Sequence, residues 1–448
     1  MIRRYAAAYR ELIRLGLPIL VSQVGVIIVG FADNIMVGHY STDALAAASF
    51  VNNVFNVVMM GCMGFTYGLT PLAGALYSAG AAGRTGALTR LALKMNVLYT
   101  LVLSAVMTVL YFYLDRLGQP AHLLPLIRPY YLIVLASMLP VAVFNVMSQW
   151  SYAINNSRLP MWIILCANLV NIAGNYCLIY GHAGAPELGL TGAGLSSLAA
   201  RILCPVAILA VFMLSRRYRA YSDGMRRTPS QRGDRRRLFR TSMPVSLQMM
   251  FETGAFSLTA IMVGWLGHIE LAAFQICIIV GMLGFCVYYS LGAAISVKVA
   301  NASSAAVGAH GLMRHYAWAG YHIMLVLMTA SSLTFALGGR VLMGIFSDDA
   351  AVVALASSLI FPVILYQLGD ATQITFANAL RGTAHVQPML WIAAFSYLVC
   401  GLPSSYLLCF TAGLRTYGVV LSFSVSLFVA ASLFLYFFLR ATRAMHDS

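Results

Sequence analysis

Three acidic residues, Asp33, Glu252 and Asp370, lie inside long apolar stretches of this sequence. Nearly all of the other acidic residues lie in polar segments or near a chain end. An ionised carboxylate in hydrocarbon costs about 2.5–3.5 kcal/mol on insertion scales, so an acid at such a position indicates function. A neutral carboxylic acid hydrogen-bonded to a neighbouring helix is the structural alternative. Buried carboxylates can bind a proton or a hard cation such as Na⁺.

Two of these acids are expected at the same depth. At 1.5 Å of rise per residue, Glu252 and Asp370 each lie about 16 Å from the cytoplasmic end of their helix, near the middle of a bilayer. Tyr366 is one helical turn from Asp370 on the same face and offers a phenolic oxygen. The pattern predicts a site made of Glu252, Tyr366 and Asp370 that can hold a proton or bind a hard cation, with Na⁺ as the candidate metal ion.

A second polar group is expected nearer the outer surface. Asp33 lies roughly 28 Å, and Asn171 and Asn175 lie roughly 20 and 26 Å, from the cytoplasmic ends of their helices. Ser197 is at a similar depth, so the four residues are candidate ligands for Na⁺ or a relay for H⁺. Polar packing between helices is the alternative for the amides and the hydroxyl. Arg201, one turn from Ser197, is either a counter-charge for a carboxylate, a lining residue of a wet cleft, or a group that discourages a cation at Asp33.

These residues require helices long enough to cross a membrane. The 448 residues are 60% hydrophobic and 9% charged, whereas soluble globular domains are roughly 25% charged. A spanning helix needs about 20 apolar residues. We therefore expect an all-α integral membrane protein with twelve transmembrane helices, near residues 15–38, 46–76, 91–113, 125–153, 160–181, 192–214, 242–266, 271–299, 316–339, 352–379, 389–410 and 417–439.

The basic residues determine the orientation. Of the 28 Lys and Arg residues behind the net charge of +15, 23 fall on the side that holds both termini and residues 215–240. The positive-inside rule places that side in the cytoplasm. The ten arginines of this segment form no interleaved aromatic platform on which bases could stack, and the segment abuts the membrane at both ends. They therefore predict contact with anionic membrane lipid and argue against nucleic acid as a partner.

The two halves of the chain repeat each other. An offset of 226 residues places Pro18 on Pro244 and residues 35–38 on residues 261–264. Six spans per half make the repeat parallel, which predicts two six-helix bundles related by a pseudo-two-fold axis along the membrane normal. We expect an N-terminal lobe at 1–214, a cytoplasmic basic linker at 215–240 and a C-terminal lobe at 241–448.

Several functional classes lack their motifs. The eight cysteines form no CxxC, the nine histidines show no zinc spacing, and no GxxxxGK[ST] phosphate-binding loop is present. No nucleophile–base pair is visible either, so we expect neither an enzyme nor a resident cofactor. A channel, which would conduct ions without coupled drug flux, also lacks support.

The sequence resembles the multidrug and toxic compound extrusion (MATE) family, in its NorM-like bacterial branch, over nearly the whole chain. The matching segments are "GFADNIMVGHYSTDALAA", "TPLAGALYSAG", "NLVNIAGNYCLIYGHAGAPELGLTGAGLSS", "PVSLQMMFETGAF" and "YQLGDATQITFANALRG". Ser197 stands where the family commonly has Thr. Phe274 stands where the family usually has His, which weakens any role for a histidine at that position.

The resemblance implies an antiporter that exports cationic amphiphilic drugs and toxic organic compounds by alternating access, driven by Na⁺ or H⁺. It assigns coupling to the residues Asp33, Asn171, Asn175, Ser197, Glu252, Tyr366 and Asp370. It assigns drug binding to the three membrane acids and to Asp348 and Asp349 on an outer connection. The implied location is the bacterial inner membrane, with both termini cytoplasmic and the chain acting as a monomer. A lipid-linked precursor flippase of the same superfamily is the alternative, although the mainly acidic cleft residues argue against it.

Overall fold

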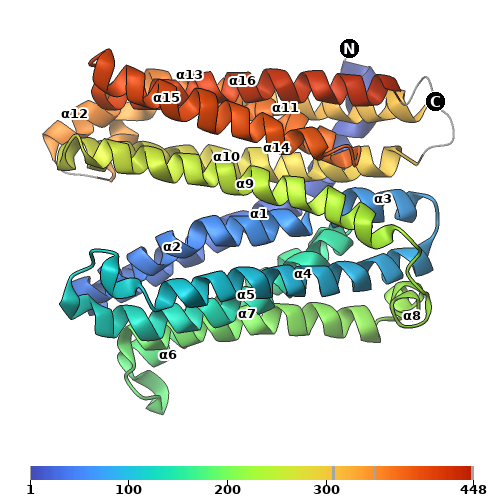
Figure 1. The fold of residues 1–448 in the computed structure, drawn as a ribbon, viewed down its shortest axis with the longest axis horizontal. Helices are drawn as coiled ribbons and strands as arrows, with labels where there is room; N and C mark the ends of the chain where they lie inside the picture. Colours follow the sequence, from blue (N-terminus) through green and yellow to red (C-terminus); the bar gives the residue numbers. More distant parts are fainter. Residues whose placement is uncertain (1, 305–307, 347–348, 445–448) are drawn as a thin grey trace. The chain divides into compact units, whose positions relative to one another are not determined.

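Helices make up nearly the whole structure (Figure 1). The computed structural model describes residues 2–304, 308–346 and 349–444, and no strand occurs among them. The α-helices of these ranges are α1 (Ile2–Tyr40), α2 (Thr42–Thr66), α3 (Leu69–Ser78), α4 (Ala82–Tyr111), α5 (Leu124–Ala153), α6 (Arg158–Tyr180), α7 (Gly189–Leu214), α8 (Arg219–Arg227), α9 (Asp234–Gly264), α10 (His268–Ala302), α11 (Ala309–Gly344), α12 (Ala350–Ser358), α13 (Ile360–Gly382), α14 (Gln387–Ala393), α15 (Leu402–Tyr406) and α16 (Arg415–Ala444). The segments η5 (Ala394–Gly401) and η6 (Leu407–Thr411) are π-helical, and η1 (Leu114–Arg116), η2 (Ala121–Leu123), η3 (His182–Gly184) and η4 (Arg216–Tyr218) are 3-10 turns.

The membrane-length helices confirm an all-α membrane protein. Among the described residues, ten helical stretches are long and apolar enough to cross a bilayer, and α12 with α13, bent by 45°, makes an eleventh. The prediction was twelve spans. The span expected near 242–266 lies in α9, which has 31 residues but is less apolar because it carries Gln248, Glu252 and Thr259.

The chain divides into two compact units, residues 21–242 and residues 1–20 with 243–448. The units differ from the predicted lobes at the start of the chain, because residues 1–20 pack with residues 243–448. These two segments together are called the later unit below. Lys298 Nζ lies 3.0 Å from Glu11 Oε2, and Tyr9 Oη lies 3.0 Å from His322 Nδ1. These contacts link the first turns of α1 to α10 and α11, and they join residues too far apart in sequence for local pattern to predict.

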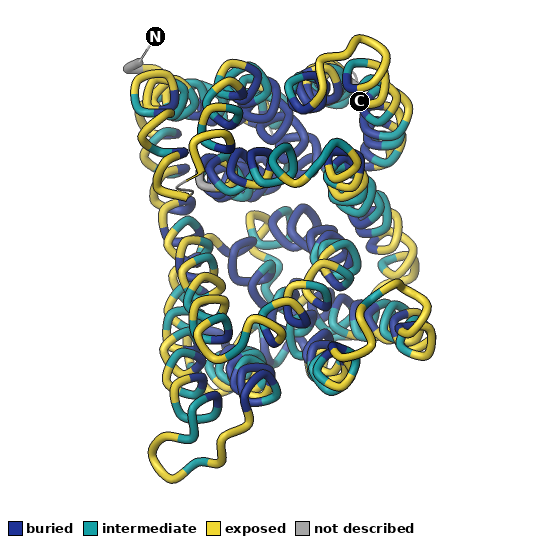
Figure 2. The backbone as a smooth tube through the Cα atoms, turned by 90° about the vertical axis from the view of Figure 1, so that its left-hand side faces the viewer, coloured by how far each residue is buried: buried dark blue, intermediate teal, exposed yellow. Residues whose placement is uncertain are grey.

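Within residues 21–242, the helices turn their buried sides toward one another and their exposed sides outward (Figure 2). The helix α7 packs along both α5 and α6 (Figure 1). Gly181 ends α6 with a φ of 72°, a left-handed conformation that glycine adopts without a Cβ clash. In hydrocarbon such helices associate through close van der Waals packing and interhelical hydrogen bonds, rather than through the hydrophobic effect.

The basic linker is folded. Its 3-10 turn η4 and helix α8 cover Trp150, which is fully buried and meets Phe212, Tyr218 and Tyr221 edge-on at 4.6, 5.3 and 5.7 Å between ring centres. The Asn156 Nδ2 group donates to Tyr218 Oη at 2.6 Å. Aromatic edge-to-face packing of this kind adds about 0.5–1.5 kcal/mol per pair beyond burial. The linker is therefore anchored to the end of α5, which carries Trp150.

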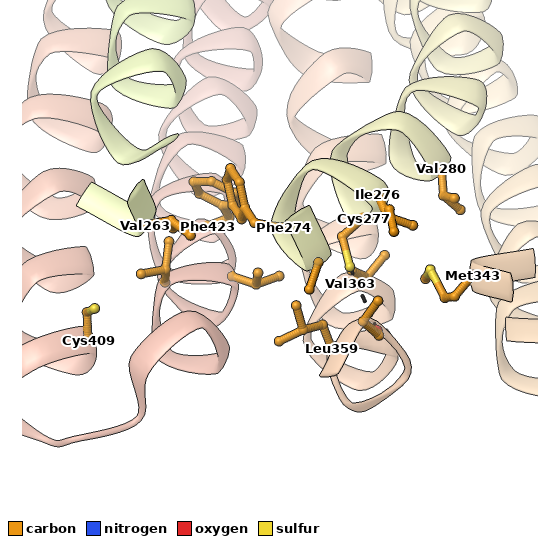
Figure 3. Close-up of a cluster of buried hydrophobic side chains, with 14 of the residues drawn as sticks. Val263, Phe274, Ile276, Cys277, Val280, Met343, Leu359, Val363, Cys409 and Phe423 are labelled. Carbon is orange, nitrogen blue, oxygen red and sulfur yellow. Dashed lines mark hydrogen bonds between the residues drawn. The ribbon is translucent and has the colours of Figure 1, made fainter. Parts of the chain in front are cut away.

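The core of the later unit includes side chains from α9, α10, α13 and α16, together with others from α11 and α12 (Figure 3). Phe274 and Phe423 lie with their ring centres 6.1 Å apart, and Val263 and Val363 are almost completely buried beside them. The residue Phe274, at the position where histidine was the expected family residue, is therefore an apolar core side chain. This core holds α9 and α13 together, and these are the helices that carry Glu252 and Asp370.

Candidate functional site

The four residues predicted for the outer site form one hydrogen-bonded chain. Asn175 Nδ2 donates to Asp33 Oδ1 at 2.5 Å, and Asn171 Nδ2 donates to Ser197 Oγ at 3.0 Å. The two amides are joined by a longer contact of 3.5 Å from Asn175 Nδ2 to Asn171 Oδ1. Both asparagines are buried, with 0% and 3% exposure for Asn175 and Asn171. The structure thus brings together an acid on α1, two amides on α6 and a hydroxyl on α7.

Close packing of α6 on α7 fixes this arrangement. Ser196 Oγ donates to the backbone oxygen of Asn171 at 2.7 Å. A Cβ at Gly174 would overlap the Ser196 hydroxyl, and a Cβ at Gly192 would overlap the backbone of Leu178. Small residues at such points allow helix backbones to approach in a membrane. The spacing of four residues between Asn171 and Asn175 then directs both amides to the same face.

Arg201 belongs to the same site. Its Nη1 donates to Ser137 Oγ on α5 at 2.6 Å. Its charge also interacts with the Asp33 carboxylate and with Tyr130, whose hydroxyl is hydrogen-bonded to Asn52. Of the three interpretations that the sequence left open, a counter-charge for the carboxylate agrees with this electrostatic interaction, and the choice among them stays a prediction.

The second cluster lies in the later unit. Glu252 on α9 and Asp370 on α13 are close enough for their charges to interact, and Asp370 is only 8% exposed. Gln248 Nε2 donates to Glu252 Oε2 at 3.2 Å. Tyr397, in the π-helical segment η5, interacts with both acids, and Arg381 acts electrostatically on Glu252. Two carboxylates and neutral oxygens are the ligand chemistry that hard cations prefer.

Tyr366 lies on α13, one helical turn before Asp370. Its phenol interacts electrostatically with Asp370, and its ring stands perpendicular to that of Phe423 at 6.1 Å. Next to it, Gln367 Oε1 accepts from Ser331 Oγ at 3.3 Å and from Tyr288 Oη at 3.5 Å. Glu252, Tyr366 and Asp370 are thus in one polar group. In the described part of the chain, no group of three or more His, Cys, Asp or Glu side chains is arranged so that it could hold a metal ion.

The predicted acidic pair on the outer connection is placed only in part. Asp349 is exposed and caps α12, because its Oδ1 accepts from the backbone N–H of Ala351 at 2.8 Å and of Val352 at 3.4 Å. Asp348 lies outside the described residues. The structure therefore gives Asp349 a helix-capping role, and its contact with drug stays a prediction.

Comparison with known proteins settles the family. The sequence model of the MatE family matches residues 18–177 and 244–407. The chain belongs to the MatE family. The two matched segments begin at Pro18 and Pro244, the residues that the internal repeat pairs. That agreement supports an internal duplication of the MatE unit.

Relatives and solved structures agree with this MatE assignment. The chain is 30% identical to "Probable multidrug resistance protein NorM" of Xanthomonas axonopodis pv. citri, over 89% of this chain and 87% of the relative. It is 29% identical to "Multidrug resistance protein PmpM" of Pseudomonas aeruginosa, over 90% and 84% of the two chains. The fold matches the eukaryotic MATE transporter AtDTX14 with a TM-score of 0.87 at 18% identity over 99% of each chain. It also matches a MOP superfamily transporter from Pyrococcus furiosus with a TM-score of 0.87 at 16% identity, over 98% of this chain and 97% of that one.

The sequence did not predict every residue of the two polar groups, one around Asp33 and one around Glu252 and Asp370. Gln248 could have been found, because it precedes Glu252 by one helical turn. No sequence pattern marked three further residues as neighbours of the acids or of Arg201: Ser137, Tyr130 and Tyr397. Hydroxyl groups are common in these helices, and only the rotation of each helix shows which of them reach the acids.

Proposed function

We propose that this chain is a secondary multidrug antiporter that exports cationic amphiphilic compounds in exchange for an inward-moving cation, Na⁺ or H⁺. The observation that carries the proposal is that each compact unit holds acids within a polar group of helical side chains, Asp33 in one unit and Glu252 with Asp370 in the other. The relatives bear the name multidrug resistance protein. The membrane potential is an adequate energy source, since one charge crossing 100 mV yields about 2.3 kcal/mol.

In this proposal the cluster of Glu252, Asp370 and Tyr366 binds the coupling cation. Two interacting carboxylates attract a single cation strongly, because the cation relieves their mutual repulsion. The Tyr366 oxygen and the amide of Gln248 supply neutral contacts of the kind used for Na⁺. The Asp33 cluster is a second coupling or drug-binding site, where the nearby positive charge of Arg201 favours a proton over a metal cation.

The direct test is Asp370→Asn. The side chain keeps its size and loses its charge, so we expect membrane insertion to be unchanged and ethidium efflux to be abolished. Asp115→Asn, at an exposed acid that pairs with Arg128 at 2.8 Å, is the matched control and should retain efflux. Full ethidium efflux by Asp370→Asn would refute the assignment of this cluster.

The coupling ion needs a separate experiment. Everted membrane vesicles should be given an imposed Na⁺ gradient or an imposed pH gradient, one at a time, while drug accumulation is followed. Accumulation driven by only one gradient identifies the ion. Movement of a lipid-linked sugar in proteoliposomes, without dependence on either cation, would instead favour the flippase alternative.

A further inference from the structure

A cavity of about 150 Å³ opens at the predicted cytoplasmic end of residues 21–242, and no part of the proposed transport sites borders it. It lies where the chain turns from α3 to α4, next to the start of α9. Its walls combine an apolar floor with charged side chains, and the lining residues are Leu72, Ala75, Leu76, Arg84, Leu88, Asp234 and Arg237.

The charged wall is ordered before any ligand arrives. Arg84 Nη2 donates to Gln231 Oε1 at 2.6 Å and lies 3.9 Å from Asp234 Oδ1. Asp234 also accepts from the backbone N–H of Gln231 at 2.8 Å. The charge of Asp234 is therefore paired with that of Arg84. Arg237, one turn further along α9, has no side-chain hydrogen bond or ion pair to the described residues, so its positive charge is left over at the cavity.

The linker behind this wall is fixed to α4. Arg90 donates from Nη1 to the backbone oxygen of Met225 and from Nη2 to that of Thr228, each at 2.8 Å. A Cβ at Gly86 would overlap the backbone oxygen of Tyr221, which shows how closely α8 lies on α4. The turn that leads from α8 to Gln231 and α9 is therefore held in place, so the cavity is a built feature of the fold.

The floor of the cavity is hydrocarbon. Leu72 and Leu88 are each 5% exposed, and Leu76 and Ala75 are partly exposed beside them. At ~30 Å³ per water in the liquid, a space of this size holds about five water molecules, close to the five non-hydrogen atoms of a phosphate. Guanidinium groups bind phosphate through paired hydrogen bonds. A guanidinium beside an apolar floor suits a ligand that carries both a phosphate and a hydrocarbon chain.

We propose that this cavity binds the phosphate of an anionic phospholipid from the cytoplasmic leaflet, with Arg237 and Arg84 on the phosphate and the first acyl carbons over Leu72, Leu76 and Leu88. The positive-inside distribution places the cavity at the level of the cytoplasmic headgroups. Besides Arg237, the surrounding segment 216–240 has nine exposed arginines that concentrate anionic lipid near the opening. Those arginines attract lipid without a defined pose, whereas the cavity gives one headgroup a defined position.

The test uses the purified full chain in a neutral detergent. Native mass spectrometry and thermal shift should be recorded against phosphatidylglycerol, phosphatidylcholine and soluble glycerol phosphate. We expect phosphatidylglycerol to bind and to raise the melting temperature, phosphatidylcholine to do neither, and glycerol phosphate to bind at least tenfold more weakly. The double variant Arg84→Gln/Arg237→Gln should lower phosphatidylglycerol affinity at least tenfold.

The matched control is Arg235→Gln/Arg236→Gln, which removes the same charge from exposed arginines that do not line the cavity. It should lower affinity less than twofold. Equal losses in the two double variants would overturn the proposal in favour of diffuse attraction, and equal binding of glycerol phosphate would exclude a role for the apolar floor. If loss of Arg84 prevents folding, Arg237→Gln alone should lower affinity at least threefold while Arg237→Lys retains it. No change in Arg237→Gln would equally overturn the proposal.

Discussion

The hydrogen bond between Asn175 and Asp33 makes a quantitative prediction about cation binding, on the basis of the proposed antiport. The amide donates to Asp33 Oδ1 at 2.5 Å, and Asn175 is fully buried. A hydrogen bond to a charged group contributes about 1.5–3 kcal/mol. The amide and an incoming cation compete for the same carboxylate, so removing the amide in Asn175→Ala should tighten cation binding.

The expected magnitude follows from that range. At about 1.36 kcal/mol per factor of ten, the half-saturating cation concentration for drug efflux should fall roughly 12- to 160-fold. The maximal efflux rate should fall as well, since each cycle requires release of the cation. Asn171→Ala is the graded comparison. The Asn171 amide donates to the neutral Ser197 hydroxyl, and a neutral hydrogen bond of about 0.5–1.5 kcal/mol allows only a roughly 2- to 12-fold change.

The assay is ethidium efflux from proteoliposomes across a series of cation concentrations. Asn96→Ala serves as the control for loss of a buried amide, because Asn96 is 2% exposed and its amide donates to the backbone oxygen of Ala92 in its own helix. It should leave the half-saturating concentration unchanged. The reasoning would be refuted by an unchanged value in Asn175→Ala, or by a larger effect in Asn171→Ala than in Asn175→Ala.

Two further predictions concern the counter-charge and the linker. Arg201→Gln should lower ethidium efflux by more than tenfold, because it removes the positive charge that acts on Asp33. Ser137→Ala removes only one hydrogen bond to Arg201 and should lower efflux less. Equal losses of efflux in the two variants would argue against a role for the charge. Gly86→Ala should lower the melting temperature of the purified protein, because overpacking against α8 costs about 1–3 kcal/mol. Gly338→Ala, at a helical glycine with open space around it, should be neutral or stabilising by up to about 1 kcal/mol, and a similar loss in both variants would contradict the close packing.

The sequence predicted the acids of both clusters because the membrane makes their signal strong. Asp33, Glu252 and Asp370 stand out as charges in apolar segments of spanning length, a pattern that is costly without a function. Polar residues one helical turn from another candidate could be predicted as well. Tyr366 was found from Asp370 in this way, and Asn175 from Asn171. The repeat that begins at Pro18 and Pro244 was visible as well, and the family match has the same two starting points.

The remaining site residues depend on helix rotation and on irregular backbone. Tyr397 reaches Glu252 from a π-helical segment, where the change in hydrogen-bond period alters the direction of each side chain. Arg201 interacts with Ser137 and Tyr130, which both lie on α5. Other serine and tyrosine residues occur along the same helix. No local pattern marks which of them face the site. The cavity beside Arg84 was also invisible, because its walls come from segments distant in the sequence.

The partners of the acidic residues separate structural carboxylates from exchangeable ones. Glu11 pairs with a lysine at 3.0 Å, Asp115 pairs with an arginine at 2.8 Å, and Glu270 pairs with Arg415. Such pairs fix a position and leave little affinity for another cation. Asp33 and Glu252 instead accept hydrogen bonds from neutral amides, and the positive charges near them, Arg201 and Arg381, act electrostatically. An amide holds a carboxyl group in place without supplying a positive charge, so these acids stay able to bind a proton or a transported cation and later to release it.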